Sequence, residues 1–130
     1  MAKKIRKSYD DIYPAGPTYI RGVRAGDTLY LSGITARGSS AEGGPPMAQL
    51  RVILDRITRI VAAEGGKPSD VVAITTYVTN IADFWPIEGE QKALYEEFFE
   101  GEYPTNSHVE VKALAMPDLH VELTATAVLD

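Results

Sequence analysis

The 130-residue sequence contains no cysteine, only two histidines and no apolar run approaching the roughly 18 to 20 residues of a membrane span. The absence of cysteine excludes disulfides, thiolate metal ligands and thiol nucleophiles. Two histidines cannot by themselves complete a typical zinc site, so we expect no bound metal. Nothing after the basic start resembles the core of a signal peptide, and we therefore expect a cytoplasmic protein that does not contact membranes.

Positive charge is also scarce, because 13 Lys and Arg residues are outnumbered by 18 Asp and Glu residues, giving a formal net charge of -5. Binding to nucleic acid relies on neutralising several phosphates at once, so we expect no nucleic-acid partner. The basic run at residues 3–7 is typical of a solvated terminus. The chain length lies in the commonest range for one domain, and we predict a single domain over residues 1–130.

The spacing of apolar and turn-forming residues predicts two helices and a series of strands. The predicted helices are 47–64 and 86–100, and the predicted strands are 19–24, 28–34, 71–78, a strand from 107, and 119–129. This order predicts an α+β fold, with both helices on one face of a single mixed sheet. Several strands carry apolar residues on both sides, so we expect other subunits to cover the second face.

Three stretches have two possible interpretations. The segment from Tyr103 to Val111 alternates from Ser107 onward, which is typical of a half-buried surface strand but also of one wall of a small-molecule site. Gly33 at a strand end indicates either a plain terminus, or a bulge or close approach by another group. The loop at 35–46, rich in small residues, is either a lid or a long solvated connection. The carboxylates of the second predicted helix indicate a solvated face.

Segments along nearly the whole chain resemble the Rid/YjgF family of reactive intermediate deaminases, which are also called L-PSP-type proteins. These segments are Gly16-Pro17, 26–33, 70–72, Tyr77-Val78, Asp83-Phe84, 95–99, Tyr103-Pro104, 109–111 and Val121-Glu122. The resemblance implies a chorismate-mutase-like fold and a homotrimer with active sites in the clefts between subunits. It also implies hydrolysis of small enamines and imines, such as 2-aminoacrylate, to a keto acid and ammonia without a cofactor.

The resemblance also implies site residues, position by position. Glu122 falls where the family has the glutamate associated with the hydrolytic water. The remaining matches concern substrate binding: Tyr19 is the first-strand aromatic, Ser32 and Gly33 are the strand-end pair, and Tyr95 lies in a matched segment of the second helix.

One position departs from the family pattern. Asn106 stands where the family carries the signature Arg that holds a substrate carboxylate in a two-pronged contact, which an amide cannot reproduce. A substrate with a carboxylate should therefore bind poorly unless another cation compensates. The candidates are Arg37, Arg21 and Arg24, each of which also fits an ordinary surface charge.

His108 replaces a frequent cysteine of the family, and it fits both a proton shuttle and a partly exposed strand histidine. The first functional hypothesis is a divergent hydrolase in which Glu122 activates water, His108 moves a proton and Asn106 hydrogen-bonds the substrate. The alternative is a non-enzymatic trimer that binds small molecules or stabilises proteins and has lost the deaminase activity. RNA cleavage, sometimes reported for relatives, is disfavoured by the acidic charge.

Overall fold

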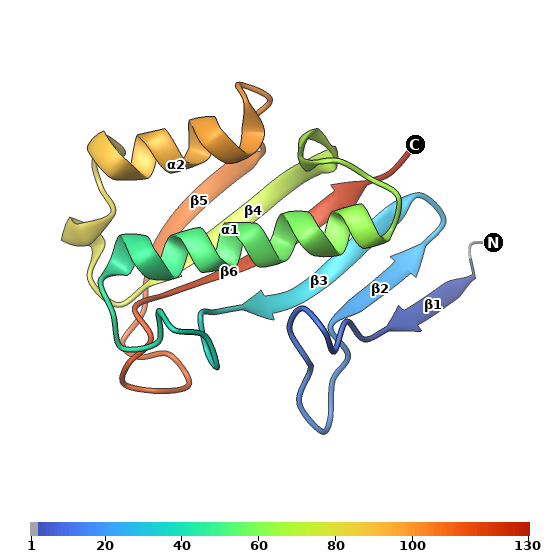
Figure 1. The fold of residues 1–130 in the computed structure, drawn as a ribbon, viewed down its shortest axis with the longest axis horizontal. Helices are drawn as coiled ribbons and strands as arrows, with labels where there is room; N and C mark the ends of the chain where they lie inside the picture. Colours follow the sequence, from blue (N-terminus) through green and yellow to red (C-terminus); the bar gives the residue numbers. More distant parts are fainter. Residues whose placement is uncertain (1–2) are drawn as a thin grey trace.

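A computed structural model describes residues 3–130, and both of its α-helices lie on the same face of a six-stranded sheet (Figure 1). Met1 and Ala2, which the predicted domain includes, lie outside the described residues. The strands are β1 (Lys4–Lys7), β2 (Gly22–Ala25), β3 (Thr28–Ile34), β4 (Val71–Val78), β5 (Thr105–Glu110) and β6 (Val121–Val128). The helices are α1 (Pro46–Ala63), α2 (Gly89–Phe99) and the short 3-10 helices η1 (Pro68–Asp70) and η2 (Ile81–Asp83).

The strand order across the sheet is β1-β2-β3-β6-β4-β5. Neighbouring strands are antiparallel except β4 and β5, which run parallel. The chain between the parallel neighbours β4 and β5 contains α2, because parallel strands need a long crossover connection, which is usually a helix. This arrangement confirms the predicted α+β fold with one mixed sheet and two helices on one face.

Helix α1 forms because apolar residues recur at helical spacing along its length. Its fully buried stripe packs against β3 and β6 and consists of Leu50, Ile53, Leu54, Ile57, Ile60 and Val61. Proline occupies the first turn, where no backbone donor is needed, and Gly65 at φ 85° follows the C-terminal end. The predicted helix 47–64 is therefore confirmed to within one residue at each end.

Helix α2 is shorter than the predicted helix 86–100. Glu88 is extended, so the helix begins only at Gly89, and Glu100 ends it in the left-handed conformation at φ 51°. Leu94, Tyr95 and Phe99 form the buried side, together with Gln91, which pattern analysis did not single out. The predicted helix therefore exists, but its start was placed three residues too early.

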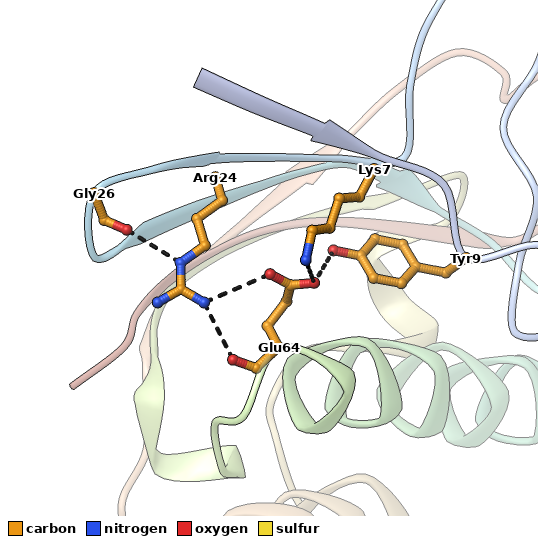
Figure 2. A network of polar contacts seen from close by, with 5 residues as sticks. All are labelled: Lys7, Tyr9, Arg24, Gly26 and Glu64. Carbon is orange, nitrogen blue, oxygen red and sulfur yellow. Dashed lines mark hydrogen bonds and ion pairs between the residues drawn. The ribbon is translucent and has the colours of Figure 1, made fainter. Parts of the chain in front are cut away.

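The N-terminal basic run is not simply a solvated terminus, because it forms the edge strand β1 against β2. Figure 2 shows what ties this end of the chain to the body: Lys7 Nζ and the Tyr9 hydroxyl each lie 3.0 Å from Glu64 Oε2. Glu64 follows the last residue of α1, and Arg24 Nη1 of β2 donates to its backbone oxygen at 3.2 Å. Four-residue β1 is too short for period-two alternation to predict it.

Two other predicted strands were also longer than the observed ones. Strand β2 covers Gly22–Ala25 rather than residues 19–24, although the Arg21 carbonyl before it still accepts a hydrogen bond from the Ser32 N–H of β3. Strand β6 covers Val121–Val128 within the predicted 119–129.

The sheet face opposite the helices carries several exposed apolar side chains. Tyr30 of β3, Val128 of β6 and Val109 of β5 are exposed by 53%, 44% and 41%. Strand alternation places them opposite the buried Leu29, Leu31 and Ala127. Their exposure motivates the expectation of a covering subunit, which stays a prediction.

Candidate functional site

The end of β3 brings the chain unusually close to β6. The pairing of these strands shifts register between Leu31 and Ile34, and Gly33 lies in that irregularity. A Cβ atom added to Gly33 would sit 2.8 Å from the carboxyl carbon of Glu122 and would overlap its oxygens. Of the two interpretations of Gly33, the structure therefore shows close approach by another group.

A pocket of about 360 Å³ opens beside this contact. It brings together the sequence-predicted residues Tyr19, Ser32, Gly33, Arg37 and Glu122. Its other lining residues, which sequence reasoning did not propose, are Tyr13, Thr35, Ala115 and Leu119. We call this space the Glu122 pocket.

Glu122 is a half-buried carboxylate without a partner in the described part of the chain. Among residues 3–130 it forms no hydrogen bond and no ion pair. Burial raises the pKa of Glu122, and the positive charge of Arg21 only partly opposes the rise. A carboxylate with a raised pKa is a better proton acceptor near neutral pH than an ordinary surface glutamate.

Arg21 lies fully buried beneath the pocket wall. Its guanidinium donates to the carbonyls of Tyr13, Pro14 and Gly33, the last at 2.7 Å, and its central carbon lies 4.1 Å from the Tyr13 ring centroid. Arg56 from α1 stacks on the same ring at 4.1 Å and donates to the Thr35 carbonyl. The sequence gives no signal for this cluster, because its members are joined only by the tertiary fold.

Asn106 of β5 and Tyr95 of α2 lie elsewhere, where that helix meets the sheet. The Thr76 hydroxyl donates to Asn106 Oδ1 at 2.8 Å, and Asn106 Nδ2 donates to the Tyr95 hydroxyl at 3.5 Å. Burial raises the pKa of Tyr95. Both residues line a largely apolar pocket of about 320 Å³, called here the Asn106 pocket, together with Ile87, Lys92, Tyr103 and Pro104.

His108 is half-buried on the same side of β5. Its Nε2 lies 3.4 Å from Nε2 of Gln91, and its ring centroid is 5.8 Å from that of the exposed Trp85. Burial lowers the pKa of His108, which favours the neutral form of the imidazole.

The structure separates His108 from Glu122. His108 pairs with Thr76 of β4, whereas Glu122 pairs with the next residue, Tyr77. Paired residues share a sheet face and successive residues alternate, so the two side chains project from opposite faces. One copy of the chain therefore cannot bring His108 or Asn106 to Glu122.

Arg24, another predicted substitute cation, does not line the Glu122 pocket and instead contacts Glu64 at the C-terminal end of α1 (Figure 2). Within residues 3–130, no three His, Asp or Glu side chains gather as metal ligands would. None of the helices in that range is long and apolar enough to cross a membrane.

Comparison with known families gives a match over most of the chain. The family model described as endoribonuclease L-PSP matches residues 10–129. A 2-iminobutanoate/2-iminopropanoate deaminase from Dermatophagoides farinae is 32% identical over 120 residues, covering 90% of this chain and 89% of that protein. A protein of the same name from Escherichia coli K12 is 34% identical over 115 residues, covering 87% and 88%.

Solved structures share the fold. A Pseudomonas aeruginosa protein of unknown function aligns with a TM-score of 0.84 and 29% identity, covering 100% of this chain and 95% of that one. A member of the YjgF/YER057c/UK114 family from Mycobacterium tuberculosis aligns with a TM-score of 0.75 and 29% identity, covering 98% and 100%.

Proposed function

The chain belongs to the Rid/YjgF family of L-PSP-type proteins, and on this premise we propose that it hydrolyses small enamines or imines to a carbonyl compound and ammonia. The observation that carries the proposal is the half-buried carboxylate of Glu122, unpaired among residues 3–130 and held against Gly33 in a pocket of about 360 Å³. In our proposal the reaction takes place in the cytoplasm and needs no cofactor.

Glu122 acts as the general base in this proposal. The ionised carboxylate takes a proton from water while the water oxygen bonds to the imine carbon, and the C=N π electrons move to nitrogen. The nitrogen of the resulting adduct takes up two protons, one returned by the Glu122 carboxyl and one from the new hydroxyl group. The electrons left on the hydroxyl oxygen form the C=O bond as the C–N bond breaks, which releases ammonia and leaves the carbonyl product. Since burial raises the pKa of Glu122, its carboxyl can return the proton to nitrogen in the second half of the reaction.

The complete site needs a second copy of the chain in this proposal. Asn106 and His108 lie on the helix-covered face, and Glu122 lies on the open face, so only the edge of a neighbouring copy can bring the two sets together. The exposed Tyr30, Val109 and Val128 give the open face an apolar surface suited to contact between copies. We propose a homotrimer in which the Asn106 pocket of one copy faces the Glu122 pocket of the next.

Ammonia release from a panel of imines tests the proposed activity. Wild type should accelerate ammonia release from at least one small imine, and Glu122→Gln should abolish the acceleration while keeping the far-UV circular dichroism spectrum. His108→Ala should lower the rate if the imidazole moves a proton across the subunit boundary. Equal rates for wild type and Glu122→Gln on every substrate would contradict the role of Glu122.

Light scattering after size exclusion tests the assembly. Wild type should have the mass of three chains, and Tyr30→Glu should release smaller species because it places a charge on the apolar open face. A wild-type protein that stays monomeric at high concentration would contradict the shared site.

One observation favours a second candidate, a non-enzymatic trimer that binds small molecules or stabilises other proteins. The Asn106 amide oxygen accepts from Thr76 and one of its two N–H groups donates to Tyr95 of the same chain, so position 106 offers no cation and only one remaining donor. In that case wild type would bind a small ligand in the cleft but release no ammonia. Asn106→Arg would gain deaminase activity if the chemistry was lost at this position.

A further inference from the structure

Three arginines converge on one wall of the Glu122 pocket. Arg37 lines the pocket itself, and the buried Arg21 and Arg56 both stack on Tyr13 directly behind the lining. Thr35 links them, because its hydroxyl contacts the Tyr13 hydroxyl at 2.9 Å and accepts the Arg37 backbone N–H at 3.2 Å. The wall is therefore a connected cluster rather than three separate surface charges.

The positive charge of this wall is not neutralised by ion pairs. Among residues 3–130, the ion pairs involve Arg24, Arg51, Arg59 and two lysines, but none of the three arginines of the wall. Burial is the main cause that lowers the pKa of Arg56. The positive charges of Arg21 and Arg37 act in the same direction, and Tyr13 and Asp55 oppose them. Glu122 is the one carboxylate lining the pocket.

Only one of the three can take a ligand. Arg21 donates to three carbonyls and Arg56 to a fourth, and both side chains are buried. Arg37 is exposed and its guanidinium forms no hydrogen bond or ion pair with residues of the described chain. Its backbone N–H donates to the Thr35 hydroxyl, which fixes where the side chain starts beside the pocket.

We propose that Arg37 binds the carboxylate of an anionic imine in the Glu122 pocket and so replaces the family Arg missing at position 106. This inference rests on the proposed hydrolase function for the reaction, but the anion site itself does not depend on it. The planar guanidinium can grip a carboxylate with two parallel hydrogen bonds, and the field of Arg21 and Arg56 strengthens the attraction. The substrate then carries an anionic group that faces Arg37, and a neutral imine would leave the positive charge of this wall without a partner.

Binding of a matched ligand pair tests the anion site without catalysis. The probes are 2-oxobutanoate, which is the hydrolysis product of 2-iminobutanoate, and butanone, which lacks the carboxylate. Their affinities are measured by ligand-observed NMR on the assembled protein. Arg37→Ala should weaken 2-oxobutanoate binding by about 10- to 100-fold, the value of a charge-assisted contact, and leave butanone unaffected.

Two further variants make the result specific. Arg37→Lys should keep part of the affinity because it retains the charge without the two-pronged geometry. Arg59→Ala removes an exposed arginine on α1 that only contacts Asp55 at 3.8 Å, and it should bind like wild type. Equal affinity of wild type and Arg37→Ala for 2-oxobutanoate would overturn the inference.

A second assay separates this inference from the proposed function. It measures ammonia release from 2-iminobutanoate, which an amino-acid oxidase with catalase generates in the reaction mixture. If wild type releases no extra ammonia but binds 2-oxobutanoate in an Arg37-dependent way, the hydrolase proposal fails and the anion site stands. If wild type and Arg37→Ala hydrolyse the imine equally well, the hydrolase proposal stands and the assignment of Arg37 is wrong.

Discussion

Two glutamates, each near an arginine, have opposite surroundings in this protein. Glu64 accepts from Lys7 and Tyr9 and lies 3.6 Å from Arg24, whereas Glu122 faces Arg21, whose donors are already used by backbone carbonyls. Burial opposes ionisation of Glu64, but its hydrogen bonds outweigh burial and lower its pKa, while burial raises the pKa of Glu122. Lys7, Tyr9 and Arg24 hold the Glu64 carboxylate in place, although its buried Oε1 accepts no hydrogen bond and has only the ion pair with Arg24. Glu122 has no such partners within residues 3–130, which leaves its carboxylate available for chemistry.

The largest expected difference between the two glutamates is in activity. Glu122→Gln should lower kcat/KM for imine hydrolysis by about 100- to 10,000-fold, because it removes the proton acceptor. Glu64→Gln should leave kcat/KM unchanged, since the Glu64 cluster lies at the other end of α1 from the Glu122 pocket. Steady-state ammonia release measures both variants, and a larger loss in Glu64→Gln would reverse the comparison.

The opposite order is expected for stability. Glu64→Gln weakens the contacts to Lys7 and Tyr9 that hold β1 in place, and it should lower the free energy of unfolding by about 2 to 3 kcal/mol. Glu122→Gln removes a half-buried, unpaired charge and should leave stability unchanged or slightly raised. Urea denaturation measures both, with Glu97→Gln as the control, because Glu97 forms only an exposed ion pair with Arg51. Greater destabilisation by Glu122→Gln would contradict the account.

The close contact at Gly33 offers a smaller perturbation of the reactive carboxylate alone. Gly33→Ala should displace the Glu122 side chain and lower kcat/KM by about 10- to 100-fold, as misplacement of a catalytic group does. In a Glu122→Ala background, which frees the space, the same change should have no further effect on residual activity. An unchanged kcat/KM for Gly33→Ala alone would show that the carboxylate position is not critical.

The pH dependence separates the two carboxylates without any substitution. Because the pKa of Glu122 is raised, activity should fall on the acid side at a pH above the ordinary glutamate pKa of 4.5. The pKa of Glu64 is lowered, so its contribution to stability is fully present above 4.5 and is lost only as pH falls through its lower folded value. The protein should therefore lose activity while circular dichroism still shows it folded, and coincident losses would argue against the assignment.

Much of this arrangement follows from local patterns. The apolar stripe of α1, the β-branched run of β4 and the alternation of β6 were predictable because each depends on periodicity within one segment. Family resemblance then placed Glu122 and Gly33 together at one pocket.

The features that distinguish the two glutamates depend on contacts between distant segments. Tyr9 and Glu64 are 55 positions apart, and the stacking of Arg21 and Arg56 on Tyr13 joins a loop, a strand end and a helix. Local patterns also could not predict the register between strands. His108 pairs with Thr76 and Glu122 pairs with Tyr77, and this register places the two predicted catalytic side chains on opposite faces of the sheet. No single segment encodes that relation.

The central claim is that Glu122 is reactive because its carboxylate lacks the partners that Glu64 has. Titration of the two side-chain carboxyl carbons by ¹³C NMR tests it most directly, with Glu64→Gln and Glu122→Gln used to assign the resonances. We predict that Glu122 titrates above the ordinary glutamate pKa of 4.5 and Glu64 below it. Titration of both at the same pH, or of Glu64 above Glu122, would contradict the claim.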